Sequence, residues 1–388
     1  MKIVEVEAIA LSAPWEKIFN GIDKVPAHLL RPAANQVATP RPGQATTLVR
    51  IQADNGLEGI GEAHGLMAPE ITMTIVGQLF RPVLLGRNPL DTGVIWELLY
   101  GMQRGNGHTR GYMLMALAGV DMALWDLKGK YLEQPVHQLL GGAYRKTIPV
   151  YASPVPFLPD PAQSAEQARV FVSQGFNAIK LKIGRGVEQD AAHVAAVREA
   201  IGPSIQLMLD CNCGYDARTA LLVANAVAPY NPFWLEEPVP PEDIDGLAFV
   251  RSRAPMRVVA GECEHSSFGI RELLSRQAVD AVQPNICRAG GITEGQRIAL
   301  VASMYNVPVA PHGVGSAVAI AAALHWMAAT SNFLIYEYNR FLNPIREEIL
   351  RQPLALRDGC LQVPDGPGLG IEIDPAVIER YSVGRLPR

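Results

Sequence analysis

Charged and polar side chains end nearly every short apolar run in the second half of this 388-residue chain. These run-ending residues are Lys180, Lys182, Asp210, Glu236, Glu237, Glu262, Asn285, His312 and Glu337. From Lys182 through Asp210, Glu236 and onward, the run ends lie 28, 26, 26, 23, 27 and 25 residues apart, the length of one strand plus one helix. Because buried charges have to be paired or bound to a metal ion, this repeat predicts a functional site.

Three of these residues, Asp210, Glu236 and Glu262, follow consecutive runs and predict a cation site. Neighbouring strands lie about 4.8 Å apart, so three carboxylates in this register can reach one ion. Ligation by oxygen alone suits Mg²⁺, or alternatively Mn²⁺, rather than zinc. Carboxylates that only pair with lysines are the alternative, which is disfavoured because three carboxylates without a cation repel one another.

Acid–base residues flank the predicted ion on two sides. Lys180 and Lys182 are two positions apart on one run and therefore share a face. His312 follows a run on the other side of the carboxylates. A base on each face suits abstraction of a proton next to a metal-bound carboxylate, and closely spaced cations are expected to depress the pKa of a lysine.

The elements that must position these residues are β-like runs that alternate with helical segments from residue 149 onward. The eight runs are Val150–Ser153, Ala178–Ile183, Gln206–Asp210, Phe233–Glu236, Arg257–Glu262, Ala281–Asn285, Val307–His312 and Phe333–Glu337. Apolar strands alternating with crossover helices indicate a parallel sheet buried on both faces, and eight units fit an α/β fold of the (β/α)8 TIM barrel type. A doubly wound open sheet is the alternative, but no complete glycine-rich phosphate loop follows any run.

The first third of the chain reads as α+β. Residues 47–53 and 57–63 alternate like strands around the turn Asp54-Asn55-Gly56, and helical patterns follow at 70–85, 90–100 and 111–130. A proline-rich stretch at residues 15–43 without periodicity is predicted to be a lid or binding loop. The tail past Leu350 has turn chemistry and is expected to pack back on the first domain.

These patterns predict three segments. Residues 1–128 form an α+β capping domain, 129–350 a barrel with the active site, and 351–388 a C-terminal segment that completes the cap.

The composition limits the function classes. Lys plus Arg number 34 against 38 Asp plus Glu, and a weakly acidic chain without basic blocks is not expected to bind nucleic acid. The most apolar stretch, Val314 to Thr330, has the length of a buried helix and is too short for a membrane span. Five cysteines without zinc-type spacing predict free thiols in a reduced protein, so a cytoplasmic location without membrane partners is expected.

The sequence resembles the enolase superfamily, in particular the mandelate racemase subgroup of the mandelate racemase/muconate lactonizing enzyme family, over nearly its whole length. The motifs that carry the resemblance are Asp54-Asn55-Gly56 with Gly61-Glu62, Asp121-Met122-Ala123-Leu124-Trp125-Asp126, Lys180-Leu181-Lys182, Asp210-Cys211-Asn212, Leu235-Glu236-Glu237-Pro238, Gly261-Glu262, Gln283-Pro284-Asn285 with Gly290-Gly291, Pro311-His312 and Pro367-Gly368-Leu369-Gly370. The resemblance implies a modified barrel under an α+β cap, with Mg²⁺ at the barrel mouth.

It also implies roles for single residues. Asp210, Glu236 and Glu262 would be the metal ligands, Lys182 the base on one face with Lys180 tuning it, and His312 the acid or base on the other. Glu337 would donate a hydrogen bond from its protonated form. The substrate-binding residues would be Asn212, Glu237, Trp15, His28 and His64, the last three from the cap.

One position departs from the family pattern. Relatives with a catalytic histidine here usually carry aspartate where this chain has Asn285. Asparagine is expected to accept a hydrogen bond from the imidazole but cannot stabilise the imidazolium by charge. His312 should therefore be a weaker base, which favours elimination or cycloisomerisation over racemisation by two bases.

The leading prediction is a lyase that dehydrates a sugar acid, an aldonate or aldarate, to a 2-keto-3-deoxy acid. The alternatives are a racemase or epimerase of an α-hydroxy acid and a cycloisomerase of a sugar-acid lactone. A non-catalytic metal-dependent binder is the least favoured. In each case the partner is a small-molecule carboxylate, and the resemblance implies a homo-oligomer.

Overall fold

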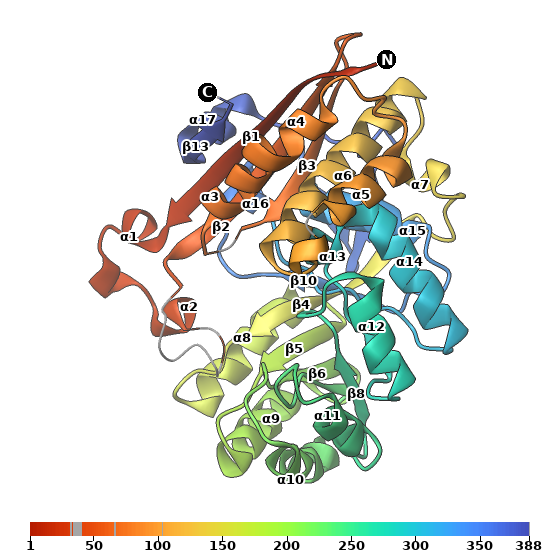
Figure 1. Cartoon of the computed structure of the whole chain (residues 1–388). Helices are drawn as coiled ribbons and strands as arrows, with labels where there is room; N and C mark the ends of the chain where they lie inside the picture. The colour runs from red at the N-terminus through yellow and green to blue at the C-terminus, as the bar shows by residue number, and fades with distance from the viewer. Residues whose placement is uncertain (32, 34–40, 66, 103, 388) are drawn as a thin grey trace.

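The computed structural model describes residues 1–31, 33, 41–65, 67–102 and 104–387. Its N-terminal part is a four-stranded antiparallel sheet in the order β13-β1-β2-β3, at the top of Figure 1. The strands are β1 (Ile3–Pro14), β2 (Gly43–Ala53), β3 (Glu58–His64) and β13 (Ser382–Leu386). The predicted hairpin is present, and Gly56 has a φ of 85° in the turn between β2 and β3.

Helices cover this sheet. They are α3 (Pro69–Thr74), which continues through a π-helical segment (Ile75–Phe80) into α4 (Arg81–Leu84), then α5 (Thr92–Gly101) and α6 (Tyr112–Tyr131). Two glycines of β3 let α6 approach closely. A Cβ on Gly59 would lie 2.0 Å from the carbonyl oxygen of Ala123, and one on Gly61 would lie 2.1 Å from that of Gly119. These contacts explain the Gly61-Glu62 motif.

The predicted lid begins with short helices, which are α1 (Trp15–Ile18), a 3-10 turn (Ile22–Lys24) and α2 (Ala27–Leu30). Residues 32 and 34–40 of the lid lie outside the described residues.

The second part is the barrel. Its strands are β4 (Thr147–Val155), β5 (Ala178–Lys182), β6 (Gln206–Asp210), β7 (Trp234–Glu236), β8 (Arg257–Ala260), β9 (Ala281–Val282) and β10 (Tyr336–Asn339). β4 to β9 are parallel in chain order, and β10 pairs with β4. Single bridges join Val282 to Val309 and Val309 to Phe333. The ring therefore passes through eight elements, as the fold prediction requires.

The seventh predicted strand is much shorter than expected. Val307–His312 takes part only through the bridge at Val309. Pro308 and Pro311 flank this position and have no N–H to donate, so the ladder cannot extend in either direction. In the eighth run, regular pairing begins at Tyr336 rather than at Phe333.

Helices surround the strands. They are α7 (Val136–Leu139), α8 (Pro161–Ser173), α9 (Val187–Ile201), α10 (Ala217–Val227), α11 (Ile244–Arg251), α12 (Ser266–Ser275), α13 (Ile286–Ala289), α14 (Gly291–Met304) and α15 (Ala317–Ala328), with 3-10 turns at Arg104–Asn106 and Ala228–Tyr230. Every residue of α15 is buried, as the apolar run at Val314–Thr330 predicts. Among the residues that the structure describes, no helix has the length and hydropathy needed to cross a membrane.

The C-terminal tail contacts both parts. It comprises α16 (Pro344–Glu348), β11 (Leu356–Arg357), β12 (Cys360–Gln362), α17 (Pro375–Tyr381) and β13. β12 pairs with β4 of the barrel, and β13 pairs with β1 of the cap. The boundaries at residues 128 and 350 remain predictions.

Buried acids join cap and barrel. Glu62 accepts hydrogen bonds from the backbone N–H groups of Ser316 and Ala319, at the start of α15. Asp121 accepts from the N–H of Thr293, 2.9 Å away. These bonds fix the cap over the open end of the barrel.

Candidate active site

The predicted site residues meet at the carboxyl ends of the barrel strands. Lys182 pairs in register with Asp210, and Asp210 with Glu236, so the three residues end neighbouring strands at one level. Glu262 stands two residues beyond β8, and Glu337 is the second residue of β10. In parallel barrels this end carries the chemistry.

The three carboxylates fit a divalent cation. Oxygen atoms of Asp210, Glu236 and Glu262 all lie within 4.8 Å of one another. An octahedral ion with ligands at about 2.1 Å separates neighbouring oxygens by about 3.0 Å and opposite ones by about 4.2 Å. Asp210 and Glu236 are fully buried and Glu262 is 9% exposed, so the charge that the neighbouring lysines leave unbalanced needs a further cation. An ion bound there would neutralise these carboxylates and stabilise negative charge on a substrate carboxylate.

The two lysines face these carboxylates. Lys180 Nζ lies 2.5 Å from Glu236 Oε1, and Lys182 Nζ lies 2.6 Å from Asp210 Oδ2. Lys182 also donates to Asn212 Oδ1 at 2.6 Å. Burial, the largest single effect, and the charge of Lys180 lower the pKa of Lys182, but Asp210, Glu262 and Glu337 together outweigh them and the net pKa is raised. The depression expected from Lys180 is therefore not the dominant effect in this structure.

The hydrogen bond between Asn285 and the imidazole of His312 has the opposite direction to the expected one. Asn285 Oδ1 accepts from the backbone N–H of Cys287 at 2.8 Å, which caps α13. The amide nitrogen Nδ2 therefore faces His312 Nδ1, 3.0 Å away, and donates to it. The expectation that Asn285 accepts from the imidazole is wrong, because its only acceptor atom already serves the helix cap.

This arrangement determines the tautomer. With Nδ1 as acceptor, neutral His312 carries its proton on Nε2, which lies 3.3 Å from Glu262 Oε2. Burial lowers the pKa of His312, while Glu262 and Glu337 oppose this effect. His312 is therefore a neutral hydrogen-bond donor in this geometry.

Glu337 is held by neighbours through both carboxylate oxygens. Its Oε1 lies 3.0 Å from Lys180 Nζ, and its Oε2 accepts from the N–H of Gly313 at 3.2 Å. Burial alone would raise the pKa of Glu337, but Lys180 and then His312 lower it to about 2. In these contacts Glu337 is an acceptor, and its role as a protonated donor to the substrate stays a prediction.

A cavity of about 100 Å³ opens between these groups. Its lining includes Lys182, Asn212, Glu262, His312 and Glu337. Lys182 and His312 thus reach one space from different strands of the ring.

Two charged lining residues escaped the sequence analysis, Arg41 from the predicted lid and Arg288 from α13. Arg41 is 9% exposed and its Nε has no hydrogen-bond partner among the described residues, while Arg288 donates to the backbone oxygen of Glu262 at 3.0 Å. Arginines in a loop and a short helix do not follow the spacing of the strand ends, so that spacing could not predict them. The position of Arg41 in the predicted lid could have indicated a substrate contact.

The remaining predicted substrate contacts are not among the described lining residues of this cavity. Trp15 is fully buried among Val25 and Leu29 inside the lid, and half-buried His28 is on α2. His64 ends β3, with Nε2 3.5 Å from Arg288. Glu237 is buried beside two cysteines and does not belong to the cavity lining that the structure describes. These four assignments remain predictions.

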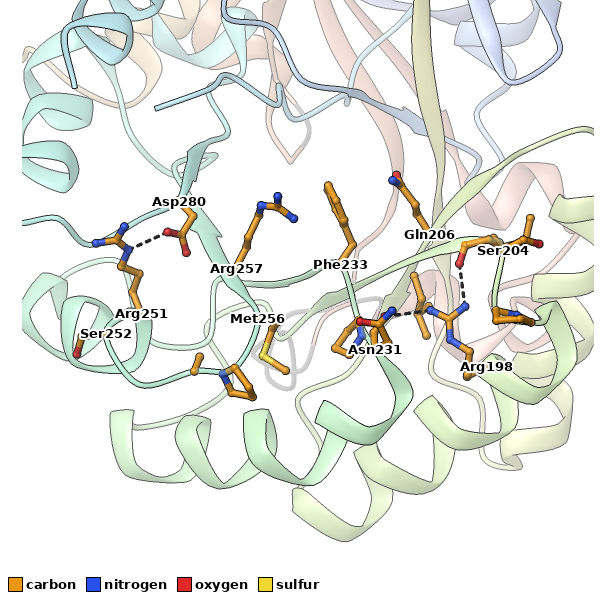
Figure 2. A pocket seen from close by; sticks show the side chains of 16 residues that line it. Arg198, Ser204, Gln206, Asn231, Phe233, Arg251, Ser252, Met256, Arg257 and Asp280 are labelled. Carbon is orange, nitrogen blue, oxygen red and sulfur yellow. Dashed lines mark hydrogen bonds and ion pairs between the residues drawn. The ribbon is translucent and has the colours of Figure 1, made fainter. Parts of the chain in front are cut away.

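A much wider cleft, of about 770 Å³, lies at the opposite, amino end of β6, β7 and β8 (Figure 2). Its arginines already have partners. Arg198 donates to the backbone oxygens of Gly202 and Ile205, both at 2.8 Å, and Arg251 lies 2.9 Å from Asp280. No site residue predicted from the sequence lines this cleft, so it is not the candidate active site.

Comparison with known proteins agrees with this geometry. Residues 24–141 match the mandelate racemase/muconate lactonizing enzyme N-terminal domain, and residues 163–377 match the enolase C-terminal domain-like family. The chain belongs to the mandelate racemase/muconate lactonizing enzyme family of the enolase superfamily and is an enzyme of that class. The resemblance and the fold inferred from the sequence are confirmed.

Relatives of defined activity share most of the chain. It is 41% identical over 358 residues to D-galactarolactone cycloisomerase of Agrobacterium fabrum, which covers 89% of this chain and 92% of that protein. It is 33% identical over 354 residues to D-xylonate dehydratase of Haloferax volcanii, at 87% and 85% coverage. The crystal structure of 3,6-anhydro-D-galactonate cycloisomerase from Zobellia galactanivorans superposes with a TM-score of 0.87 at 33% identity and covers 99% of this chain and 100% of that one.

Proposed function

We propose that this enzyme removes the proton α to the carboxylate of a sugar acid and eliminates an oxygen from the β carbon, with Mg²⁺ at Asp210, Glu236 and Glu262. Mn²⁺ has the same ligand preference and should substitute for it. The proposal is supported by the position of Lys182 and His312, which line one cavity beside the three carboxylates.

The leaving oxygen we favour is that of a lactone ring, so the reaction is a ring-opening cycloisomerisation. The observation behind this choice is the hydrogen bond from Asn285 to His312 Nδ1. A second proton on Nδ1 would face the amide N–H of Asn285, so the imidazolium form is disfavoured and His312 is a poor proton donor to a leaving group.

A lactone oxygen needs little such help. It departs as a carboxylate, the conjugate base of an acid with a pKa of about 4. A departing hydroxide is the conjugate base of water, with a pKa of about 15.7, and requires a proton from a general acid.

The two arginines support the same choice. Elimination from a lactone leaves a new carboxylate in the cavity that Arg41 and Arg288 line. Buried guanidinium groups bind carboxylates strongly, and Arg41 Nε has no other hydrogen-bond partner. A six-carbon aldarate lactone, with one free carboxylate and one ring ester, matches this charge distribution.

The bond changes balance without a co-reactant. Lys182 Nζ takes the α proton, the electron pair forms the C=C bond, and the C–O bond to the β carbon breaks. The ring oxygen leaves as a carboxylate near the arginines. The enol then takes a proton at the β carbon and becomes a 2-keto-3-deoxy diacid.

Dehydration of an open-chain sugar acid is the second candidate. It uses the same proton abstraction by Lys182, and the D-xylonate dehydratase of Haloferax volcanii supports it. Racemisation is less favoured, because His312 Nε2 already carries a proton in the neutral tautomer and cannot accept another.

Purified protein in Mg²⁺ buffer tests these candidates when it is offered D-galactaro-1,4-lactone, the open-chain aldarate and a set of aldonates. Proton NMR in D2O and semicarbazide absorbance follow the keto acid. Keto acid from the lactone and not from the open acids supports cycloisomerisation, and the reverse supports dehydration. Deuterium exchange without keto acid would contradict both.

Matched variants assign the signal to the site. Lys182→Met should abolish turnover, while Lys2→Met, at an exposed lysine of the cap, should leave it unchanged. We also infer that the enzyme is cytoplasmic and forms a homo-oligomer, as expected from the sequence. Light scattering of the purified protein tests the oligomeric state.

A further inference from the structure

A second group of potential ligands lies beside the three carboxylates and has no part in the proposed reaction. It consists of Cys213, Glu237 and Cys263, which follow β6, β7 and β8 respectively. The three residues therefore stand in successive loops at the same barrel mouth. Both thiols are free and half-buried.

The carboxylate of Glu237 lacks a cationic partner. Glu237 is only 4% exposed. Its contacts are with thiols, since Cys213 Sγ lies 3.7 Å from Oε2 and Cys263 forms a side-chain hydrogen bond with the same carboxyl group. Within the described ranges no lysine, arginine or histidine pairs with it. A buried carboxylate in this position needs a proton or a metal ion.

The spacing between Cys213 and Glu237 suits two ligands of a tetrahedral ion. Zinc binds thiolate sulfur at about 2.3 Å and carboxylate oxygen at about 2.1 Å, which places sulfur and oxygen about 3.6 Å apart at a tetrahedral angle. The observed separation between Cys213 Sγ and Glu237 Oε2 is 3.7 Å. Cys213 and Cys263 form a side-chain hydrogen bond with each other, so the two thiols are neighbours.

A fourth ligand is available from Glu262. Ligand atoms of Glu237, Glu262 and Cys263 all lie within 4.8 Å of one another. Glu262 also belongs to the carboxylate group proposed to bind Mg²⁺. The two sites would share this residue but differ in chemistry, because one offers only oxygen and the other two sulfurs.

We propose that Cys213, Cys263 and Glu237, with Glu262 as the fourth ligand, form a separate site for a thiophilic divalent cation of the Zn²⁺ type. Soft sulfur ligands select such ions over Mg²⁺. Occupation draws Glu262 away from the Mg²⁺ site, so Zn²⁺ should inhibit the enzyme through ligands of which only Glu262 lines the substrate cavity.

Cadmium reports this site directly, because bonds between Cd²⁺ and thiolate produce an ultraviolet charge-transfer absorption. The full-length reduced protein is titrated with CdCl2 in excess Mg²⁺, after thiol counting confirms five free cysteines. We expect one Cd²⁺ per chain, the appearance of the band, and protection of two thiols from a thiol reagent. Excess Zn²⁺ should compete for the same ligands and reduce the band.

Variants locate the ion. Cys213→Ser and Cys263→Ser should each abolish the band and weaken binding more than about 100-fold, and Glu237→Gln should weaken it about 10- to 100-fold. Cys360→Ser, at a half-buried cysteine on β12, is the matched control and should bind as the parent does. Asp210→Asn, which disables the proposed Mg²⁺ site, should keep the band.

Three results would overturn the proposal. One is the absence of a band in the reduced protein, and another is unchanged Cd²⁺ affinity in Cys213→Ser. The third is loss of binding in Asp210→Asn with retention in both serine variants, since the ion would then occupy the three carboxylates. The readout is independent of turnover, so it holds whether or not the proposed reaction is correct.

Discussion

The two ends of the barrel carry charged residues in opposite circumstances. At the carboxyl end, acids and bases crowd around a cavity of about 100 Å³ and pair mainly with one another. At the amino end, a cleft of about 770 Å³ is lined by arginines that bind backbone carbonyls and one aspartate. Volume alone would select the wrong end.

The two ends differ in the partners that their charged side chains bind. Arg198 and Arg251 satisfy carbonyl groups in the turns that follow helices and strands, a structural duty in any protein. Lys180 and Lys182 bind no backbone carbonyl group among the described contacts and are held by carboxylates and, for Lys182, by the side chain of Asn212. Charges that do not stabilise the backbone mark the reactive end, and five predictions test this contrast.

The largest effect is expected at Lys182. Lys182→Met removes the proposed base and should lower kcat at least about 1,000-fold, because general acid–base groups contribute about 10² to 10⁴. Circular dichroism and thermal unfolding in Mg²⁺ should change little. A variant that keeps more than a tenth of the parental kcat would remove Lys182 from the chemistry.

Removal of the cation should affect the free energy of unfolding through the carboxyl end of the barrel and not through the amino end. Mg²⁺ at 100 times its Kd adds about 2.7 kcal/mol to the free energy of unfolding. Urea titrations with Mg²⁺ and with EDTA measure this increment. It should disappear in Asp210→Asn and persist in Arg251→Gln, and an equal increment in both variants would place the ion elsewhere.

At the amino end, stability rather than activity should respond. Arg198→Met leaves the carbonyls of Gly202, Ile205 and Tyr230 without this donor and should cost about 2 kcal/mol. The same variant should keep kcat within about twofold, because the cleft has no part in the reaction. Urea unfolding and a substrate assay, run on one preparation, check both statements, and a large fall in kcat would break the contrast.

Asn285→Asp should change the kind of reaction more than its rate. A carboxylate at this position accepts the Nδ1 proton of His312 and leaves Nε2 free to take a proton from substrate. We expect at least about a tenfold rise in deuterium exchange at the α carbon on the histidine side. NMR in D2O measures it, with Asn285→Ala as the control that offers no acceptor. Unchanged exchange would mean that the parental tautomer is not the one inferred.

The smallest effect is expected at Arg257, which lies over the Phe233 ring in the amino-end cleft at 4.7 Å. Arg257→Gln should change stability by about 0.5 kcal/mol, as for surface substitutions. Its kcat should equal that of the parent protein. A loss of activity would show that the cleft communicates with the opposite end.

The strand ends were predictable because a barrel converts a linear repeat into a ring. Asp210, Glu236 and Glu262 follow consecutive buried runs, and the spacing alone places their carboxylates together. The hairpin was equally clear from Asp54-Asn55-Gly56, since local turn chemistry determines it. Both features depend on short-range patterns.

The features that the sequence analysis missed depend on tertiary contacts, or on two possible donors for the same acceptor atom. Arg41 reaches the cavity from the lid, which has no period from which to place it. Asn285 was assigned the wrong hydrogen bond because its oxygen is taken by the cap of α13. The contact of Glu337 with Lys180 at 3.0 Å joins the second and last strands of the ring, and no local motif specifies it.

The pairing of β13 with β1 has a consequence for the order of synthesis. β1 emerges from the ribosome before any of the barrel, and β13 after all of it. Until then the outer edge of β1 has no partner, and unpaired edges invite association with other chains. A ribosome-bound chain lacking β13 should therefore be the aggregation-prone species. The last strand pairs with β1 and covers its exposed edge only after the whole barrel has been synthesised.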